Sequence, residues 1–257
     1  MDLTNKVAII TGGASGLGKA SAQALIAKGA KVAIFDMNEA LANETATELG
    51  AQCIAATVDV TNETSVAAGI SETLNKLGQI DILVNCAGIG PPAKVINREG
   101  EPLPMAQFKK IVDINLFGTF NCLRLAAAEM VKNKPYNSDG GRGVIINVAS
   151  VAAFDGQIGQ PAYAASKAAV AGMTLPIARE FAFHGIRVNT IAPGLFMTPL
   201  AESLPENVVE ALGNSVEFPK RLGKPEEFAH LVVNMAENDY FNGEVVRLDG
   251  AIRMKAK

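Results

Sequence analysis

Short runs of β-branched and other apolar residues recur along the chain, separated by longer stretches in which apolar residues follow a helical period. Seven such runs predict strands at 7–11, 32–35, 54–58, 82–85, 144–148, 188–192 and 245–248. Between them lie Ala-rich stretches such as KASAQALIAKG at 19–29, which ends on Lys28 and Gly29 as a helix does. Strands and helices are therefore expected to alternate.

The predicted strands are apolar on both faces, as in VAIIT and VIINV. Strands covered on both sides are typical of a parallel sheet with a layer of helices on each face. We therefore predict an α/β fold with a doubly wound, parallel, seven-stranded sheet. The 257 residues suffice for one large core or two small ones, and the uninterrupted alternation favours a single domain over 1–257.

Composition narrows the possible functions. Charged residues make up 19% of the chain, with a net charge of −3 and no long block of one sign, so no basic face is expected for nucleic acid or an anionic membrane. The apolar run near the N-terminus is too short for a signal segment or a membrane span. Cys53, Cys86 and Cys122 lack CxxC spacing, which favours free thiols in a reducing, cytoplasmic compartment. His184 and His230 lie far apart, so no metal site is expected.

A glycine-rich segment, TGGASGLGK, follows the first predicted strand and opens the first helix. Gly12, Gly16 and Gly18 would let the backbone turn tightly and approach a pyrophosphate at the helix N-terminus. Asp36 ends the second strand, where a carboxylate accepts both ribose hydroxyls of NAD and repels the 2′-phosphate of NADP. Neither Ser15 nor Met37 supplies a cation for that phosphate, so NAD is the expected cofactor. A plain tight turn with a solvated aspartate is the alternative.

Tyr163 and Lys167 stand four residues apart in PAYAASKAAVAGM. On a helix that begins at Pro161 they share one face, and an ammonium beside the phenol would lower its pKa toward that of a general base. Ser150 ends the fifth strand, at the sheet edge where ligands of such folds bind, and its hydroxyl could hold a carbonyl oxygen. Taken alone, the three could equally be a half-buried aromatic, a surface lysine and a turn residue.

Together these motifs resemble the short-chain dehydrogenase/reductase family. TGGASGLG is similar to its cofactor motif, NCAG at 85–88 to its NNAG-like segment, and Ser150 with YAASK to its catalytic motifs, while Asn115 in DINLFGTF matches its fourth catalytic position. The motifs occur in the family order over essentially the whole chain. The resemblance implies a catalytic set of Asn115, Ser150, Tyr163 and Lys167, with Ser150 and Tyr163 contacting substrate.

The resemblance also implies a set of cofactor contacts beyond the three glycines and Asp36. These are Ser15, Leu17, Asp59, Val60, Asn85, Cys86, Ala87, Gly88, Tyr163, Lys167, Pro193 and Phe196. Asp59 and Val60 would flank the adenine, Lys167 would bind the nicotinamide ribose, and Asn115 would position a water that relays protons.

The stretches SVAAF, GMTLPIAR, TIAPGLF and NGEVVRLDGAIRM resemble members that interconvert 3-hydroxyacyl-CoA and 3-oxoacyl-CoA with NAD. An acyl-CoA substrate and a homotetramer are therefore expected. Two enzymatic alternatives stay open, a 3-oxoacyl carrier-protein reductase and a hydroxysteroid or alcohol dehydrogenase. A scaffold or RNA-processing subunit is the non-enzymatic alternative. The loop from Gly90 to Met105 differs from those members and is expected to border the acyl pocket.

The segment after Phe196 has a helical apolar period. Leu200, Leu204, Val208 and Leu212 lie four apart in TPLAESLPENVVEAL, which predicts one amphipathic helix. We expect residues 195–220 to close over substrate as an apolar lid. A helix packed permanently on the core is the alternative.

Overall fold

The computed structural model describes residues 1–256, except for the side chain of Leu200. A single sheet runs through its centre, formed by β1 (Val7–Thr11), β2 (Lys31–Asp36), β3 (Cys53–Thr57), β4 (Ile82–Asn85), β5 (Gly143–Val148), β6 (Ile186–Pro193) and β7 (Val245–Leu248). All pairs are parallel and the order is β3-β2-β1-β4-β5-β6-β7. The predicted α/β class and all seven strands are confirmed, with boundaries shifted by at most two residues.

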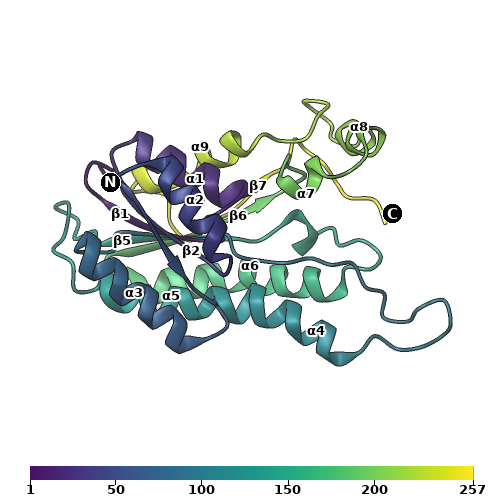
Figure 1. Cartoon of the computed structure of the whole chain (residues 1–257), viewed down its shortest axis with the longest axis horizontal. Coiled ribbons are helices and arrows are strands. Elements are labelled where there is room, and N and C mark those ends of the chain that lie inside the picture. The colour runs from purple at the N-terminus through teal and green to yellow at the C-terminus, as the bar shows by residue number, and fades with distance from the viewer. Residues whose placement is uncertain (257) are drawn as a thin grey trace.

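Helices cover both faces of the sheet (Figure 1). They are α1 (Gly16–Ala27), α2 (Glu39–Leu49), α3 (Glu63–Leu77), α4 (Met105–Val112), α5 (Thr119–Met130), α6 (Pro161–Ala182), α7 (Pro199–Glu202), α8 (Glu206–Asn214) and α9 (Pro225–Glu237). Figure 1 shows α1, α2 and α9 on one face and α3, α5 and α6 on the other. A π-helical segment, Asp113–Gly118, joins α4 to α5.

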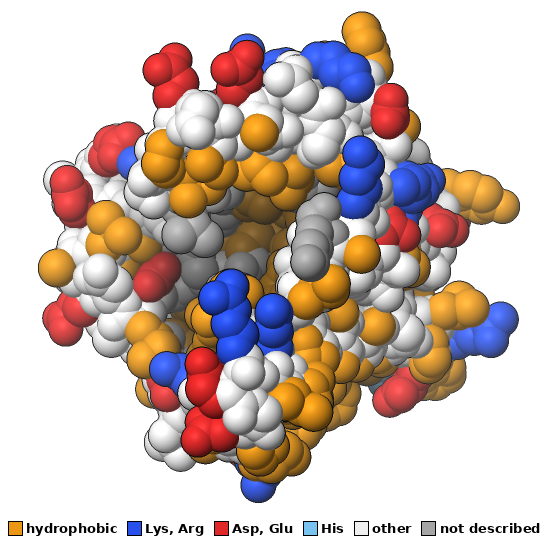
Figure 2. Space-filling model, turned by 90° about the vertical axis from the view of Figure 1, so that its right-hand side faces the viewer, with side chains coloured by type: hydrophobic (Ala, Val, Ile, Leu, Met, Phe, Trp, Pro, Cys, Tyr) orange, Lys and Arg blue, Asp and Glu red, His pale blue; other side chains and the backbone are white. Residues whose placement is uncertain are grey.

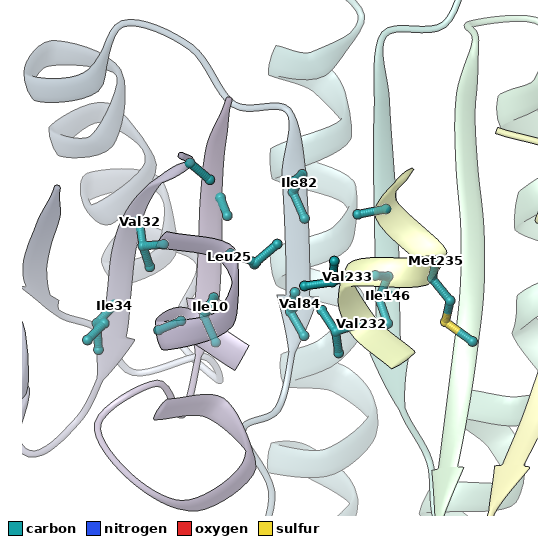
Figure 3. Packing of buried hydrophobic residues seen from close by; sticks show 14 of the residues in the cluster. Ile10, Leu25, Val32, Ile34, Ile82, Val84, Ile146, Val232, Val233 and Met235 are labelled. Carbon is teal, nitrogen blue, oxygen red and sulfur yellow. The ribbon is translucent and has the colours of Figure 1, made fainter. Parts of the chain in front are cut away.

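Each face of the sheet carries its own hydrophobic core, as two-sided apolar strands require. On the first face, Leu25 of α1 and Val232 of α9 are fully buried against Ile10 and Val84 (Figure 3). Each such side chain stabilises the fold by about 1.5 to 3 kcal/mol relative to exposure. The two cores hold the sheet between the helix layers and fix where the carboxyl ends of the strands lie.

The strand order places a topological switch point between β1 and β4. From β1 the chain continues through β2 and β3 on one side, then returns to β4 on the other. In open α/β sheets a ligand binds at this point, outside the carboxyl ends of the strands. The fold therefore places the glycine-rich segment and the segment after β4 beside the same crevice.

The single amphipathic helix predicted across Leu200 to Leu212 is wrong. The structure has two helices, α7 and α8, separated at 203–205. Pro205 has ψ 143° and lacks the N–H that a continuing helix needs, and a proline also disfavours helical geometry in the residue before it. The four-residue apolar spacing therefore spans two helices rather than one.

Candidate active site

The glycine-rich segment forms a tight turn between β1 and α1. Gly12 and Gly16 have φ of 62° and 51°, in the left-handed region that favours glycine. A Cβ on Gly18 would lie 2.2 Å from the carbonyl oxygen of Gly12, so a larger residue would force the strand and helix apart. Ser15 is the N-cap of α1 but its side chain caps no backbone N–H. The first turn of α1 therefore keeps amide groups available for an anion.

The segment after β4 packs against this turn. The Ala87 N–H donates to Thr11 Oγ1 at 3.1 Å, and a Cβ on Gly12 would lie 3.0 Å from Ala87. Asn85 donates to Asn147 Oδ1 on β5 at 2.9 Å inside the sheet. Burial raises the pKa of the Cys86 thiol to about 12, so this cysteine stays protonated and offers backbone rather than thiolate chemistry.

Asp36 lies at the carboxyl end of β2, beside the glycine turn. Its Oδ2 accepts from the Ala14 N–H at 3.3 Å, and its Oδ1 accepts from the Asn38 N–H at 3.0 Å. Lys19, the cation that ends the glycine motif, pairs with Glu48 at 2.6 Å. The carboxylate thus carries its charge at the point where an adenosine ribose would lie in a fold of this type.

Asp59 and Val60 follow β3 at the same edge of the sheet. Asp59 Oδ1 accepts from the backbone and hydroxyl of Thr61 at 2.9 and 2.7 Å. Val60 is buried, its carbonyl accepts from Asn121 Nδ2 at 2.9 Å, and its side chain packs on Gly118. The π-helical segment and α5 therefore fix this part of the rim.

Two cofactor candidates after β6 lie near the lid segment. Pro193 ends β6 at the same edge. The ring of Phe196 packs edge-on to Phe228 with 6.1 Å between centroids and leaves no room for a side chain on Gly223. Phe196 is 9% exposed, so its ring belongs mainly to the core and its backbone is the part best placed for a ligand. Beyond it, Thr198 and Pro199 lie within 3.8 Å of the Cβ position of Gly16, so the segment crosses the glycine turn.

Tyr163 and Lys167 share one face of α6, as predicted. Tyr163 lies in the first turn and Lys167 one turn later, with Nζ 5.9 Å from the centre of the phenol ring. Lys167 is 4% exposed and its Nζ donates to the Val148 carbonyl, at the end of β5, at 2.7 Å. Ser150 lies two residues beyond the end of β5, not at its last position as predicted, and its Oγ accepts from the Ala152 N–H at 3.1 Å. Phenol, ammonium and hydroxyl therefore converge at the end of β5.

The pKa values differ from the sequence prediction. Burial raises the pKa of Tyr163, and a hydrogen bond with Ser150 only partly opposes that rise. Burial also lowers the pKa of the Lys167 ammonium from 10.5 to about 8. The predicted lowering of the phenol pKa is therefore wrong for the protein alone. Desolvation is the largest cause of both pKa shifts, and it disfavours the charged form of each group.

Asn115 links three parts of the site. Its Oδ1 accepts from the Ile89 N–H at 2.8 Å, while its Nδ2 donates to the Ile89 carbonyl at 2.8 Å and to Ser166 Oγ at 3.0 Å. Ser166 Oγ in turn donates to the carbonyl of Tyr163 at 2.8 Å. Both amide hydrogens are thus used, so a relay water could be held only by an oxygen of Asn115.

The sequence motifs do not predict three contributors to the site: Ile89, the contact of Gly90 with the Tyr163 ring, and the π-helical geometry around Asn115. A Cβ on Gly90 would lie 3.0 Å from the Tyr163 ring, and one on Gly88 would lie 3.3 Å from Lys167 Nζ. The close spacing of Gly88 and Gly90 was the available signal. π-Helical turns inside α-helices occur frequently at functional sites.

A cavity of about 430 Å³ lies beside the first turn of α6. Val95, Ile158 and Ala164 give it apolar walls, and Lys94 also lines it. Lys94 forms no ion pair within residues 1–256. Figure 2 views the end of the molecule that carries α7 and α8 and shows a hollow with largely hydrophobic walls and lysine or arginine side chains on part of its rim.

Other chemistry is not supported by the described residues. Within 1–256 no three His, Cys, Asp or Glu side chains gather in a way that could hold a metal ion. The helical run Met105–Met130 is long and apolar enough by composition to cross a bilayer, but half of it is buried in the protein. A core helix of a folded domain has these properties.

Comparison with known proteins gives concordant results. A family model described as short chain dehydrogenase matches residues 6–208. The 3-hydroxyacyl-CoA dehydrogenase type-2 of Homo sapiens is 52% identical, covering 97% of this chain and 95% of the relative, and that of Drosophila melanogaster is 51% identical. A 3-oxoacyl acyl-carrier-protein reductase of Thermotoga maritima is 36% identical over 98% of this chain. The crystal structure of 3-hydroxyacyl-CoA dehydrogenase type-2 from Mycobacterium avium superposes with a TM-score of 0.94 at 43% identity, covering 98% of both chains.

Proposed function

The chain belongs to the short chain dehydrogenase family and is an oxidoreductase, and from this premise we propose that it interconverts 3-hydroxyacyl-CoA and 3-oxoacyl-CoA with NAD. The observation that carries the proposal is the convergence of Tyr163, Lys167 and Ser150 at the end of β5, with an apolar cavity against the first turn of the same helix α6 and Lys94 in the cavity wall. An acyl chain suits such walls, and a CoA thioester carries phosphates that a cation can attract.

The residues around the crevice fit a dinucleotide. The backbone between Gly12 and Gly18 is too crowded for side chains, which is the condition for close approach to a pyrophosphate. Asp36 supports NAD over NADP, because a 2′-phosphate would meet its negative charge. When bound, the nicotinamide ring would accept or deliver the hydride. Asp59, Val60, Pro193 and Phe196 remain candidates for its other contacts.

In the proposed oxidation, the phenolate of Tyr163 removes the proton from the 3-hydroxyl group. Ser150 Oγ donates a hydrogen bond to that oxygen and holds it as the carbonyl forms. Lys167 would stabilise the phenolate and so oppose the burial that raises the pKa of Tyr163 in the protein alone. A water on an oxygen of Asn115 would relay the proton to solvent. In reduction, Tyr163 donates the proton.

We propose residues 195–220 as a lid on this site. Leu204 and Val208 are 38% and 37% exposed, so the apolar side of this segment is not fully packed on the core. The segment passes over Gly16, so closing it would cover a bound dinucleotide and exclude water. We also propose a cytoplasmic homotetramer with no role at membranes or on nucleic acid.

The proposal is tested by initial rates on a panel of 3-hydroxyacyl-CoAs, hydroxysteroids and simple alcohols, each with NAD and with NADP. The highest kcat/KM is expected for a 3-hydroxyacyl-CoA with NAD. Tyr163→Phe is expected to reduce kcat by about 10²-fold or more while NADH still binds, because the proton acceptor is lost and the crevice is not. Tyr240→Phe, which removes the hydroxyl of a fully exposed tyrosine, serves as the matched control and is expected to leave kcat unchanged.

A near-normal rate for Tyr163→Phe would refute the assigned role of Tyr163. A preference for NADPH and a carrier-protein thioester would favour the reductase alternative, for which a 36% identical relative exists. A preference for steroids would favour the hydroxysteroid dehydrogenase alternative, to which a 35% identical relative, the 3alpha-hydroxysteroid dehydrogenase of Mediterraneibacter gnavus, corresponds. Tight RNA binding without turnover would favour the scaffold.

A further inference from the structure

Residues 154–160 connect the end of β5, with Ser150, to the first turn of α6, with Tyr163. They form neither helix nor strand. Within the segment, the Gln160 N–H donates to the Gln157 carbonyl at 3.0 Å and Gln160 Oε1 accepts from the Gln157 N–H at 3.1 Å. Five of its residues, 156 to 160, line the 430 Å³ cavity. The position of this side of the cavity therefore depends on contacts between residues 154–160 and other parts of the chain.

Arg247 of β7 holds the beginning of the segment. One guanidinium nitrogen, Nη2, donates to Asp155 Oδ2 at 2.5 Å and to the Ile252 carbonyl at 2.9 Å. Its Nε donates to Asp249 Oδ2 at 2.8 Å, and its Cζ lies 5.5 Å from the centre of the Phe154 ring. The side chains of Arg247 and Asp155 are 21% and 20% exposed, so this ion pair is shielded from solvent better than a surface pair.

The chain after β7 holds the rest of the segment. Gln157 Nε2 donates to the Lys255 carbonyl at 3.0 Å, and the Ile158 N–H donates to the Ala256 carbonyl at 3.1 Å. On the other side, the Ala93 N–H donates to the Gly159 carbonyl at 2.7 Å. The segment 154–160 therefore lies between residues 252–256 and the loop after β4. Arg247 connects residues 252–256 to the segment, because it donates to both the Ile252 carbonyl and Asp155.

We propose that Arg247 is a positioning residue for substrate. Together with Asp155 and residues 252–256 it forms a clamp that holds the cavity wall in the geometry that binds the acyl group. This rests on the proposed function and goes beyond it, because Arg247 contacts none of the catalytic side chains. Two facts support a role in binding rather than in general stability. The residues held by 255–256 and by Ala93, namely 157–159, all line the cavity. The Arg247 guanidinium contacts Phe154 and Asp155 at the start of this segment, and also Ile252 in the chain end that holds it.

The test compares Arg247→Met, Arg247→Lys and Asp155→Asn with the wild type. Arg247→Met and Asp155→Asn are expected to raise KM for acetoacetyl-CoA by about tenfold and change kcat by less than about threefold, with NADH affinity unchanged. Arg247→Lys, which keeps the charge but not the forked contacts, is expected to fall between them and the wild type. Hydrogen exchange of the amides in 151–164 is expected to be faster in Arg247→Met and Asp155→Asn.

Lys6→Met is the matched control, because Lys6 also joins a shielded carboxylate and an aromatic ring. Lys6 Nζ lies 3.1 Å from Asp81 Oδ1 and 5.3 Å from the Tyr136 ring centre, at the opposite end of the strands. It is expected to leave KM and exchange in 151–164 unchanged. Unchanged exchange in Asp155→Asn would overturn the clamp, and so would an equal loss of kcat and gain of KM in both clamp and control variants.

The experiment distinguishes failure of the proposed function from failure of the positioning role. If the wild type does not turn over acetoacetyl-CoA, the substrate assignment is wrong, and the exchange comparison still decides whether Arg247 holds residues 154–160. If exchange responds and KM for the true substrate does not, the clamp is structural only and the positioning role is overturned.

Discussion

At the scale of the residue, the site combines two groups whose charged forms are both disfavoured by burial. The pKa of Tyr163 is raised and that of Lys167 is lowered to about 8. The ammonium therefore sits in an unfavourable environment at neutral pH, and its 2.7 Å bond to the Val148 carbonyl offsets only part of this. Such strain at an active site is expected to reduce the stability of the folded protein.

Replacing Lys167 by methionine is therefore expected to stabilise the protein at neutral pH while it removes activity. Below pH 8 both the folded and unfolded states carry the proton, so the cost of burial is present in full; between pH 8 and 10.5 the folded state releases it first and the wild type gains stability. We expect Lys167→Met to melt on the order of 5 °C higher at pH 7, with a smaller gap at pH 9.5.

Thermal unfolding at the two pH values measures this difference. Lys110→Met, at an exposed position of α4, is the control and is expected to show neither shift. A gap for Lys167→Met that is the same at pH 7 and pH 9.5 would contradict the assigned pKa.

The sequence predicted the residues of the site better than their chemistry. Tyr163 and Lys167 are four residues apart, so their shared face depends on one helix alone and was predictable. The direction of the Tyr163 pKa shift depends on burial by segments far away in the chain, including Gly90 against its ring, and no local pattern contains that information.

At the scale of the element, the close packing of α1 on the turn after β1 requires a glycine at position 18. Gly18→Ala would place a Cβ 2.2 Å from the Gly12 carbonyl oxygen, which requires the turn to open. NADH affinity is therefore expected to fall more than about tenfold, with a lower melting temperature. Titration of NADH fluorescence measures the loss.

Gly172→Ala is the matched control in a helix. Nothing lies within 4 Å of its Cβ position on α6, so the change is expected to stabilise the protein by about 0.5 to 1 kcal/mol and leave NADH affinity unchanged. Equal NADH affinity in Gly18→Ala and Gly172→Ala would rule out the tight turn as the reason for the glycine.

Elements with a strong local signal were predicted well. β1 and β4 have their predicted bounds because their apolar runs end on the polar residues Thr11 and Asn85. The break at Pro205 could have been predicted, because proline disfavours an uninterrupted helix. The π-helical segment could not, since DINLFG carries no residue type that distinguishes it from an α-helix.

At the scale of the whole molecule, apolar side chains lie on the outer helices. Phe117 and Phe120 are 58% and 46% exposed on the run Met105–Met130. Exposed clusters of this kind mark contacts with other protein surfaces, which supports the proposed tetramer.

Phe120→Glu is expected to reduce the assembly to a smaller species on light scattering, whereas Val208→Glu on α8 is expected to leave it unchanged. A Phe120→Glu protein of wild-type mass would exclude this surface from the interface.

Long-range contacts were the part of the molecule that the sequence did not reveal. Arg247 and Asp155 are 92 residues apart, and each looks like an ordinary surface charge in its own segment. Only the order β5-β6-β7 brings the end of β7 near the residues that follow β5.

The π-helical turn around Asn115 restricts how the chain can change in length. A π-helix accommodates an additional residue within an α-helix, so loss of one residue from 113–118 would restore an ordinary helix. Residues on one side of the deletion would then rotate by about 100° relative to the other. Asn115 would turn away from Ile89 and Ser166, or Asn121 would turn away from Val60. Insertions and deletions compatible with catalysis must therefore fall outside this helix.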